Sequence, residues 1–168
     1  GLRAPGSFDG FELAVRAVLG QQITLEAARQ LAGKLVRECG APLGGGRFAF
    51  PSPQAVSRAT LDSLGMPRAR KDTLRAVAQA AVDDAGIFRS LDDVDETVRR
   101  LRTIRGVGEW TAHYIALRAA REPDAFPATD VALIRGAGIE AGALAHRAER
   151  WRPWRAYAAQ HLWTKAAS

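Results

Sequence analysis

The stretch LRTIRGVGEWTA, residues 101–112, decides how this chain folds. It predicts a helix that ends at about Arg102, a tight Gly-Val-Gly hairpin at residues 106–108, and a new helix that begins at once at Glu109. Glycines allow backbone angles that other residues resist, and their missing side chains let another backbone approach closely. The start of the new helix adds unpaired N–H groups and the positive end of a helix dipole. The hairpin is therefore a candidate phosphate-binding site.

The residues around the glycines narrow this interpretation. A Gly-x-Gly turn alone is weak evidence, because an ordinary connection between two helices also uses glycines for its geometry. Leu101 and Ile104 before the turn, with Thr111 and Ala112 after it, favour a helix-hairpin-helix in which Val107 fills the space between the helices. Such a motif binds the DNA backbone without reading the base sequence. It therefore predicts DNA binding and leaves the chemistry open.

The rest of the chain has the pattern of helices joined by loops, and we expect a compact all-α protein. Residues 41–53 contain three consecutive glycines and three prolines, so we expect a surface loop there. No strand is predicted anywhere. Helices or helical turns are predicted over residues 8–19, 24–39, 53–58, 60–64, 68–84, 91–101 (after Ser90), 109–121 and 153–164 (with Pro153 in the first turn), and further helices begin at 131 and near 145.

Composition limits the class of protein. The chain has 168 residues, a length typical of one domain, and no segment is apolar enough to span a bilayer. Its 24 Lys and Arg exceed its 18 Asp and Glu, giving a net charge of +6 that fits a polyanionic partner. The excess of arginine over lysine also fits a GC-rich coding sequence. With Cys39 as the single cysteine no internal disulfide forms, and we expect a cytoplasmic, nucleoid-associated protein.

Asp130 is the candidate for chemistry. It follows a proline-bearing loop and stands directly before an apolar helix. An aspartate in that position is more often a helix N-cap than a catalytic group. Its place relative to the hairpin favours a catalytic role, because the order along the chain is hairpin, one helix, proline-bearing loop and aspartate.

Together these features resemble the helix-hairpin-helix DNA glycosylases, most closely the bacterial 3-methyladenine DNA glycosylase II type of alkylation repair. The resemblance covers nearly the whole chain, and its motifs are specific only in combination. It implies one two-lobed helical glycosylase domain over residues 1–168, with the active site in the cleft between the lobes and without the family's N-terminal β-rich domain. The matching stretches are residues 10–15, 18–21, 50–53, 64–67, 106–118 (GVGEWTAHYIALR), 148–157 and 161–163.

The resemblance implies that Asp130 is the catalytic carboxylate. An alkylated purine with a positive ring is a good leaving group, and one carboxylate can stabilise the oxocarbenium-like sugar and help a water attack it. Bifunctional relatives such as endonuclease III carry a Schiff-base lysine where this chain has Trp110, so we expect base release without strand cleavage. The lone Cys39 implies no iron–sulfur cluster, and no catalytic metal or organic cofactor is implied. Thr129 stands where a second aspartate occurs in some relatives.

Three aromatic residues are the expected substrate pocket. Trp110 and Tyr114 are four residues apart and share a helix face. With Trp163 they match pocket positions of the resembling enzymes, where electron-rich rings suit a flipped, cationic base. The alternative is that tryptophans in a small helical protein are mostly core, and we expect that role for Trp151 and Trp154.

DNA contacts are expected from two turns. The turn that contains Gln21 and Gln22 matches the family's wedge, which fills the hole left by a flipped base, although a polar turn between helices is the alternative. The family also suggests a monovalent cation at the hairpin carbonyls. His113 and His161 are expected to have structural roles. The DNA-contacting positions expected at the hairpin are Arg105, Gly106, Val107, Gly108 and Thr111.

The predicted function is a monofunctional DNA glycosylase that hydrolyses the N-glycosidic bond of alkylated bases of the 3-methyladenine type in base excision repair. We expect it to act as a monomer on double-stranded DNA that carries a damaged base, with no membrane partner. Two alternatives remain open: a non-catalytic helix-hairpin-helix DNA-binding module in which Asp130 is only a cap, and a glycosylase of another base specificity. A purely structural or protein-interaction role is supported by no specific residue pattern, only by the fact that many helical domains have such roles.

Overall fold

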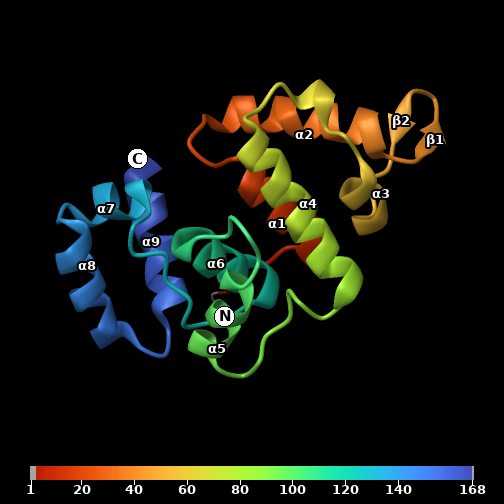
Figure 1. Ribbon diagram of the computed structural model, residues 1–168. Coiled ribbons are helices and arrows are strands. Elements are labelled where there is room, and N and C mark those ends of the chain that lie inside the picture. The colour runs from red at the N-terminus through yellow and green to blue at the C-terminus, as the bar shows by residue number, and fades with distance from the viewer. Residues whose placement is uncertain (1–2, 168) are drawn as a thin grey trace.

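The structure is a computed structural model that describes residues 3–167, and its helices confirm the all-α expectation (Figure 1). Within that range, no helix combines the length and the apolar character needed to cross a bilayer. The helices are α1 (Gly10–Leu19), α2 (Leu25–Cys39), α3 (Pro53–Arg58), α4 (Arg68–Asp83), α5 (Val94–Arg102), α6 (Glu109–Ile115), α7 (Val131–Ala137), α8 (Ala141–Ala148) and α9 (Arg155–Ala167), with shorter turns η1 (Asp62–Leu64), η2 (Ala116–Ala120) and η3 (Glu149–Trp151).

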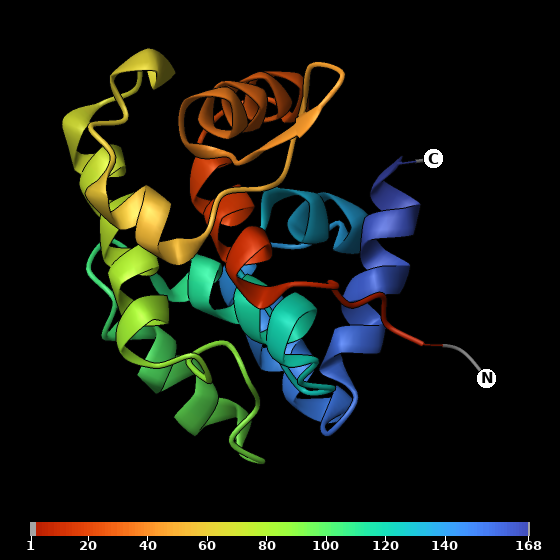
Figure 2. The same cartoon turned by 90° about the vertical axis from the view of Figure 1, so that its right-hand side faces the viewer.

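The helices form two lobes. Helices α1 to α4 make one lobe and α7 to α9 the other, with α5 and α6 between them (Figure 1). α1 packs against α4 and also against α6, while α7 packs against α9. Figure 2 shows α1 in the middle of the molecule, with α4 on one side and α9 on the other. The predicted two-lobed arrangement is therefore present.

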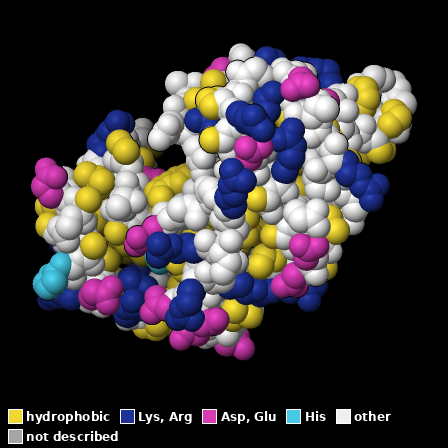
Figure 3. Space-filling view, in the orientation of Figure 1, with side chains coloured by type: hydrophobic (Ala, Val, Ile, Leu, Met, Phe, Trp, Pro, Cys, Tyr) yellow, Lys and Arg dark blue, Asp and Glu magenta, His cyan; other side chains and the backbone are white. Residues whose placement is uncertain are grey.

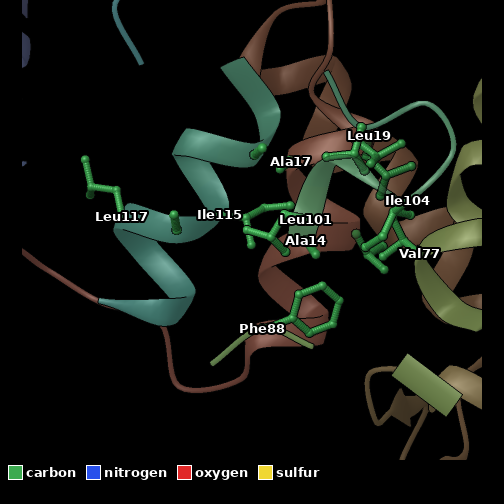
Figure 4. Close-up of a cluster of buried hydrophobic side chains, with 14 of the residues drawn as sticks. Ala14, Ala17, Leu19, Val77, Phe88, Leu101, Ile104, Ile115 and Leu117 are labelled. Carbon is green, nitrogen blue, oxygen red and sulfur yellow. The ribbon is translucent and has the colours of Figure 1, made fainter. Parts of the chain in front are cut away.

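Part of the core lies where α1 meets the helix that follows the hairpin. Ala14 of α1, Leu101 of α5 and Ile115 of α6 are all completely buried. Figure 4 shows these side chains together, with Phe88 closing one end of the cluster. Because Ala14 is small, α1 can lie close to α6, and this contact joins the first lobe to the middle of the molecule.

Side-chain caps explain where several helices begin. The Asp9 carboxylate accepts from the Glu12 N–H at 2.7 Å and starts α1. The prediction for α5 was wrong at its start: the helix begins at Val94 because Asp93 caps it. Ser90, the expected start signal, instead donates its hydroxyl to Glu122 at 2.6 Å.

The prediction that the chain has no strand was also wrong. Residues Pro42–Gly44 (β1) and Arg47–Phe48 (β2) pair as a short antiparallel hairpin within the expected loop. Gly44, Gly45 and Gly46 all adopt positive φ angles, which reverse the chain tightly enough for the flanking residues to pair. The two strands are exposed, and the β1–β2 hairpin projects from the first lobe (Figure 1).

Two further helices differ from expectation in detail. The predicted helix 109–121 has the expected extent but changes after Ile115 into a π-helical turn, and it ends where Arg121 adopts a φ of +61°. The last helix begins at Arg155, two residues after the expected proline. The Trp154 N–H donates to the Trp151 carbonyl at 2.8 Å, so these residues form a separate turn before α9.

Candidate active site

A cleft of about 770 Å³ lies between the two lobes. Figure 3 shows it as a notch in the surface, with hydrophobic side chains in its floor and basic side chains at its edges. One wall comes from α1, α2 and the turn between them, and the other from α6, η2, α7 and α9. The lining residues are Leu13, Arg16, Ala17, Gly20, Ile23, Thr24, Leu25, Ala28, Arg29, Trp110, Tyr114, Arg118, Asp130, Ala132 and Trp163.

Asp130 is both a helix cap and part of this cleft. Its Oδ1 accepts from the backbone N–H groups of Ala132 at 2.9 Å and Leu133 at 3.0 Å, as an N-cap of α7 does. The same carboxylate lines the cleft. The two interpretations of Asp130 are therefore compatible, because capping uses one oxygen and leaves the other available.

Two indoles fix the orientation of this carboxylate. The Trp110 Nε1–H donates to Oδ2 of Asp130 at 2.8 Å, and the Trp163 Nε1–H donates to Oδ1 at 3.0 Å. Oδ1 thus receives three hydrogen bonds and Oδ2 one. Each carboxylate oxygen carries two lone pairs, so Oδ2 keeps one that can face a ligand in the cleft.

The three expected aromatic residues form one wall of the cleft. Trp110 and Tyr114 stack with ring centroids 5.3 Å apart and ring planes 10° apart. Tyr114 meets Trp163 edge to face, at 6.3 Å and 73°. The structure therefore brings together residues from α6 and α9 that lie about fifty positions apart in the sequence. Flat rings in this arrangement can stack against a planar base.

Close packing of α7 on α9 brings Asp130 next to Trp163. A Cβ added to Gly136 would lie 2.1 Å from the Leu162 carbonyl oxygen, so only glycine allows this approach. No sequence pattern singles out Gly136, because a glycine within a helix usually only lowers the stability of that helix.

A buried ion pair anchors the start of α9. The Arg155 guanidinium donates from Nε to Asp124 Oδ1 at 2.8 Å and from Nη2 to Oδ2 at 2.9 Å, and both residues are buried. This bidentate pair ties α9 to the loop that leads to Asp130. This ion pair was not predicted from the sequence, since no local pattern connects residues 31 positions apart.

Arg118 is a cleft residue that the sequence analysis also missed. Its guanidinium carbon lies 5.0 Å from the Trp163 ring centroid and 6.0 Å from the Tyr114 ring centroid. The available signal was its spacing, because Arg118 follows Tyr114 by four residues on the helix face that carries Trp110.

The hairpin has the geometry that its sequence predicts. Gly106 adopts a φ of +83°, and a Cβ there would lie 1.9 Å from the Thr73 hydroxyl oxygen of α4. Val107 is 5% exposed and fills the interior, as expected. Gly108 and Arg105 are exposed, and Arg105 reaches Asp72 only at 3.9 Å. The turn is therefore glycine-dependent at Gly106 and open to solvent on its other side.

The two glutamines of the wedge turn have different surroundings. Gln22 is exposed and adopts a φ of +58°, which is uncommon for a residue with a side chain. The Gln21 amide donates to the Thr111 hydroxyl at 3.0 Å, and the Thr111 side chain is buried. Gln21 and Thr111 therefore connect the wedge turn to the helix after the hairpin, and the Thr111 side chain points away from any ligand at the surface.

The remaining aromatic and histidine expectations have mixed outcomes. Trp151 packs edge to face against Phe126 at 5.9 Å, in agreement with a core role. The core prediction for Trp154 was wrong, because 58% of that residue is exposed beside Tyr157. The sequence pattern did not distinguish the packed Trp151 from the exposed Trp154, since each lies in an irregular turn before α9.

The two histidines also differ. The Nδ1 atom of His113 accepts from the Phe126 N–H at 3.4 Å, and burial lowers the pKa of His113, which favours the neutral ring that such an acceptor requires. His113 thus has a structural setting. His161 is exposed on α9 and contributes little to packing.

Comparison with known proteins agrees with this geometry. Residues 15–149 match the family described as HhH-GPD superfamily base excision DNA repair protein. The chain is 40% identical to the "probable bifunctional transcriptional activator/DNA repair enzyme AlkA" of Mycobacterium tuberculosis, covering 98% of this chain and 35% of that protein. It is 37% identical to DNA-3-methyladenine glycosylase 2 of Escherichia coli, covering 97% of this chain and 60% of that protein. The chain thus spans about a third to three fifths of these relatives.

Solved structures show the same fold. A DNA-3-methyladenine glycosidase from Bacillus halodurans superposes with a TM-score of 0.80 at 20% identity, covering 99% of this chain and 80% of that one. The 3-methyladenine DNA glycosylase Mag1 of Schizosaccharomyces pombe, solved in complex with abasic DNA, gives a TM-score of 0.79 at 21% identity, covering 100% and 85%. At these identities the likeness establishes the arrangement of the helices.

Proposed function

Because this chain belongs to the HhH-GPD superfamily of base excision DNA repair proteins, we propose that it is a monofunctional DNA glycosylase that hydrolyses the N-glycosidic bond of alkylated bases of the 3-methyladenine type. The observation that carries the proposal is the Asp130 carboxylate, held by the Trp110 and Trp163 indoles in an aromatic cleft between the lobes. The 37% identity to a DNA-3-methyladenine glycosylase supports the choice of substrate.

In the proposed reaction the damaged nucleotide is flipped into the cleft with its C1′ atom facing Oδ2 of Asp130. The bond between C1′ and the base nitrogen breaks, and its electron pair leaves with the base. A cationic base thereby becomes neutral. The Oδ2 atom stabilises the positive charge that develops on the sugar. A water oxygen then bonds to C1′, and the water proton passes to Asp130 and on to solvent.

The aromatic wall supports recognition of a cationic base. The stacked pair of Trp110 and Tyr114, with Trp163 at its edge, offers flat electron-rich surfaces. A positive ring gains both stacking and cation–π attraction at such surfaces, and the gain is larger where water is excluded. An undamaged neutral base lacks the second contribution.

Base release should leave the DNA strand intact. A lyase reaction needs an amine that attacks C1′ and forms a Schiff base. Among the described residues that line the cleft there is no lysine, and Trp110 occupies the position where bifunctional relatives carry one. The product is therefore an abasic site.

The exposed part of the hairpin is the proposed contact to duplex DNA. Gly106 and Gly108 are exposed, so a phosphate can approach their backbone, and the exposed Arg105 adds a positive charge. Gln22 is the proposed wedge, because it is exposed in a left-handed conformation between the cleft-lining residues Gly20 and Ile23. Gln21 and Thr111 position this turn. We propose that the protein acts as a monomer on DNA in the cytoplasm.

We also propose a monovalent cation at the hairpin carbonyls. The Val107 N–H donates to the Ile104 carbonyl at 3.0 Å, which forms the turn in which these carbonyls lie. A cation held there would add positive charge beside the phosphate. DNA affinity should then be higher in potassium chloride than in an equal concentration of a bulky organic chloride.

The test of the proposed function uses a duplex that carries one alkylated purine. Base release by the parent is compared with release by an Asp130→Asn variant, in which the amide oxygen can still cap α7. We expect release by the parent, a loss on the order of 10³-fold in the variant, and intact strands until alkali is added.

Other results would select a different function. Equal DNA binding by both proteins, without base release from either, would favour a non-catalytic DNA-binding module. Release of an oxidised or mismatched base in preference to an alkylated one would favour a glycosylase of another specificity. Strand cleavage without alkali would contradict the monofunctional assignment.

A further inference from the structure

Arg118 places a positive charge on the aromatic wall that the base is proposed to contact. Its guanidinium carbon lies 5.0 Å from the ring centroid of Trp163, and it lines the same cleft as Asp130. The Trp163 indole nitrogen donates to Asp130. A single indole therefore separates the proposed catalytic carboxylate from a guanidinium.

The helix that follows the hairpin places the Asp130 carboxylate and Arg118 at opposite ends of the aromatic wall. Trp110 and Tyr114 stack on one face of α6, and Arg118 follows four residues later in the π-helical turn η2, with its guanidinium carbon 6.0 Å from the Tyr114 ring centroid. Trp110 contacts the carboxylate at one end, and Arg118 stands at the other. A nucleotide whose sugar faces Asp130 would point the far edge of its base toward Arg118.

The Arg118 charge is not neutralised by a carboxylate. None of the described residues forms an ion pair with Arg118, and its Nη1 donates to the Pro5 carbonyl at 2.9 Å. A guanidinium carries five N–H donors, so this one bond leaves donors available for a ligand. The base end of the cleft thus combines flat rings with an available cationic donor.

Such a donor acts oppositely on the two kinds of damaged base. A cationic alkylated base is attracted by the rings but repelled by the like charge of Arg118. A neutral base with a carbonyl oxygen on its far edge accepts a charge-assisted hydrogen bond from the same group. Building on the proposed function, we propose that Arg118 is a specificity-determining residue that extends base release from cationic bases to neutral, carbonyl-bearing ones.

The chemistry of the leaving group strengthens this effect. When a neutral base departs, the electron pair of the broken C1′–N bond makes it an anion until it takes a proton from water. A positive donor at its carbonyl oxygen stabilises that developing charge in the transition state. A cationic base departs as a neutral molecule and needs no such help.

The test compares release of two bases from otherwise identical duplexes under single-turnover conditions. One duplex carries hypoxanthine, which is neutral and has a carbonyl oxygen, and the other carries 3-methyladenine, which is cationic in the nucleotide and has no carbonyl oxygen. The variant is Arg118→Gln. The matched control is Arg121→Gln, because Arg121 likewise donates to the N-terminal segment, at the Ser7 carbonyl, but does not line the cleft.

We expect Arg118→Gln to slow hypoxanthine release about tenfold to a hundredfold and to leave 3-methyladenine release unchanged or faster. The control should change neither rate. Equal slowing of both bases by Arg118→Gln, or the same pattern in the control, would show that Arg118 only supports the structure and would overturn the inference.

A second measurement does not depend on catalysis. Quenching of tryptophan fluorescence reports binding of the free nucleosides inosine, which is neutral and has a carbonyl oxygen, and 1-methyladenosine, which is cationic and has none on its base. Arg118→Gln should weaken the binding of inosine and tighten that of 1-methyladenosine. If the parent released no base but Arg118→Gln still changed the two nucleoside affinities in opposite directions, the proposed function would fail and the role of Arg118 would stand. If Arg118→Gln changed neither affinity, the role of Arg118 would fail.

Discussion

The hairpin and the floor of the cleft reach their geometry in different ways. In the hairpin, Gly106 and Val107 are placed by the backbone of a few consecutive residues, and one further contact, to Thr73, limits the size of residue 106. At the floor of the cleft, Asp130, Trp110 and Trp163 come from the starts of α7 and α6 and from the last helix. The first site is local, whereas the second exists only when α7 and α9 are correctly packed against each other and against α6.

This difference predicts how each site fails. A change in the hairpin should damage one turn and its DNA contact, while the rest of the fold stays intact unless Thr73 is displaced. A change in the packing of α9 should move Trp163 away from Asp130 without touching either residue. Stability and base release are therefore expected to respond differently in the two regions.

The largest effect on stability is expected from Arg155→Met. Arg155 is 6% exposed and Asp124 is 8% exposed, so the substitution leaves a buried carboxylate without its bidentate partner. We expect a loss of about 3 kcal/mol in the free energy of unfolding, measured by urea denaturation, together with slower base release. Asp124→Asn should give a similar loss.

Arg152→Met is the matched control for that change. Arg152 also contacts Asp124, but its side chain is 39% exposed, and exposed ion pairs contribute at most about 1 kcal/mol. Equal losses for the two variants would mean that α9 is not anchored by the buried pair, and the contrast between a local and a docked site would then lose its main support.

The helix starts and turns that were predicted correctly from the sequence are those determined by neighbouring residues. Asp9 and the glycines of the hairpin act within a few residues, so their effects were predictable. The start of α5 was missed because Asp93, rather than Ser90, satisfies its first N–H groups. The β1–β2 hairpin was missed because three positive φ angles in succession reverse the chain in a segment without alternating hydrophobicity.

The candidate site was predictable where a pattern or the family resemblance reached it. Asp130 and the three aromatic residues were identified before the structure, and the structure brings them together in one cleft. Gly136 and the Asp124–Arg155 pair were not identified, because their partners lie on segments that are distant in the sequence. The residues of the site were thus predictable from the sequence, whereas their geometry depends on the packing of α9.

An intermediate effect is expected from Gly106→Ala. Its Cβ would collide with the Thr73 side chain, and its φ of +83° is unfavourable for alanine. We expect a loss of about 2 kcal/mol in the free energy of unfolding and weaker binding to duplex DNA. Thermal unfolding and DNA titration at two salt concentrations measure the two effects.

Gly108→Ala separates folding from DNA contact. Gly108 has a φ of −81°, and no atom lies within 4 Å of an added Cβ, so the fold should tolerate the change. If the backbone at this position approaches a phosphate, the added methyl group should still weaken DNA binding. Unchanged affinity in a stable Gly108→Ala protein would argue that DNA contacts another part of the hairpin.

A small effect is expected from Trp110→Phe, which tests how strongly the site in the cleft depends on one indole N–H. Phenylalanine keeps a ring that can stack on Tyr114 but removes the donor to Asp130 Oδ2. Because Oδ1 retains its three donors, the carboxylate should lose only part of its orientation. We expect base release to slow about tenfold, which corresponds to about 1.4 kcal/mol in the barrier, with DNA affinity unchanged.

Trp163→Phe removes one of the three donors to Oδ1 and should slow base release less than Trp110→Phe does. A larger loss for Trp163→Phe would mean that Oδ1, rather than Oδ2, faces the sugar.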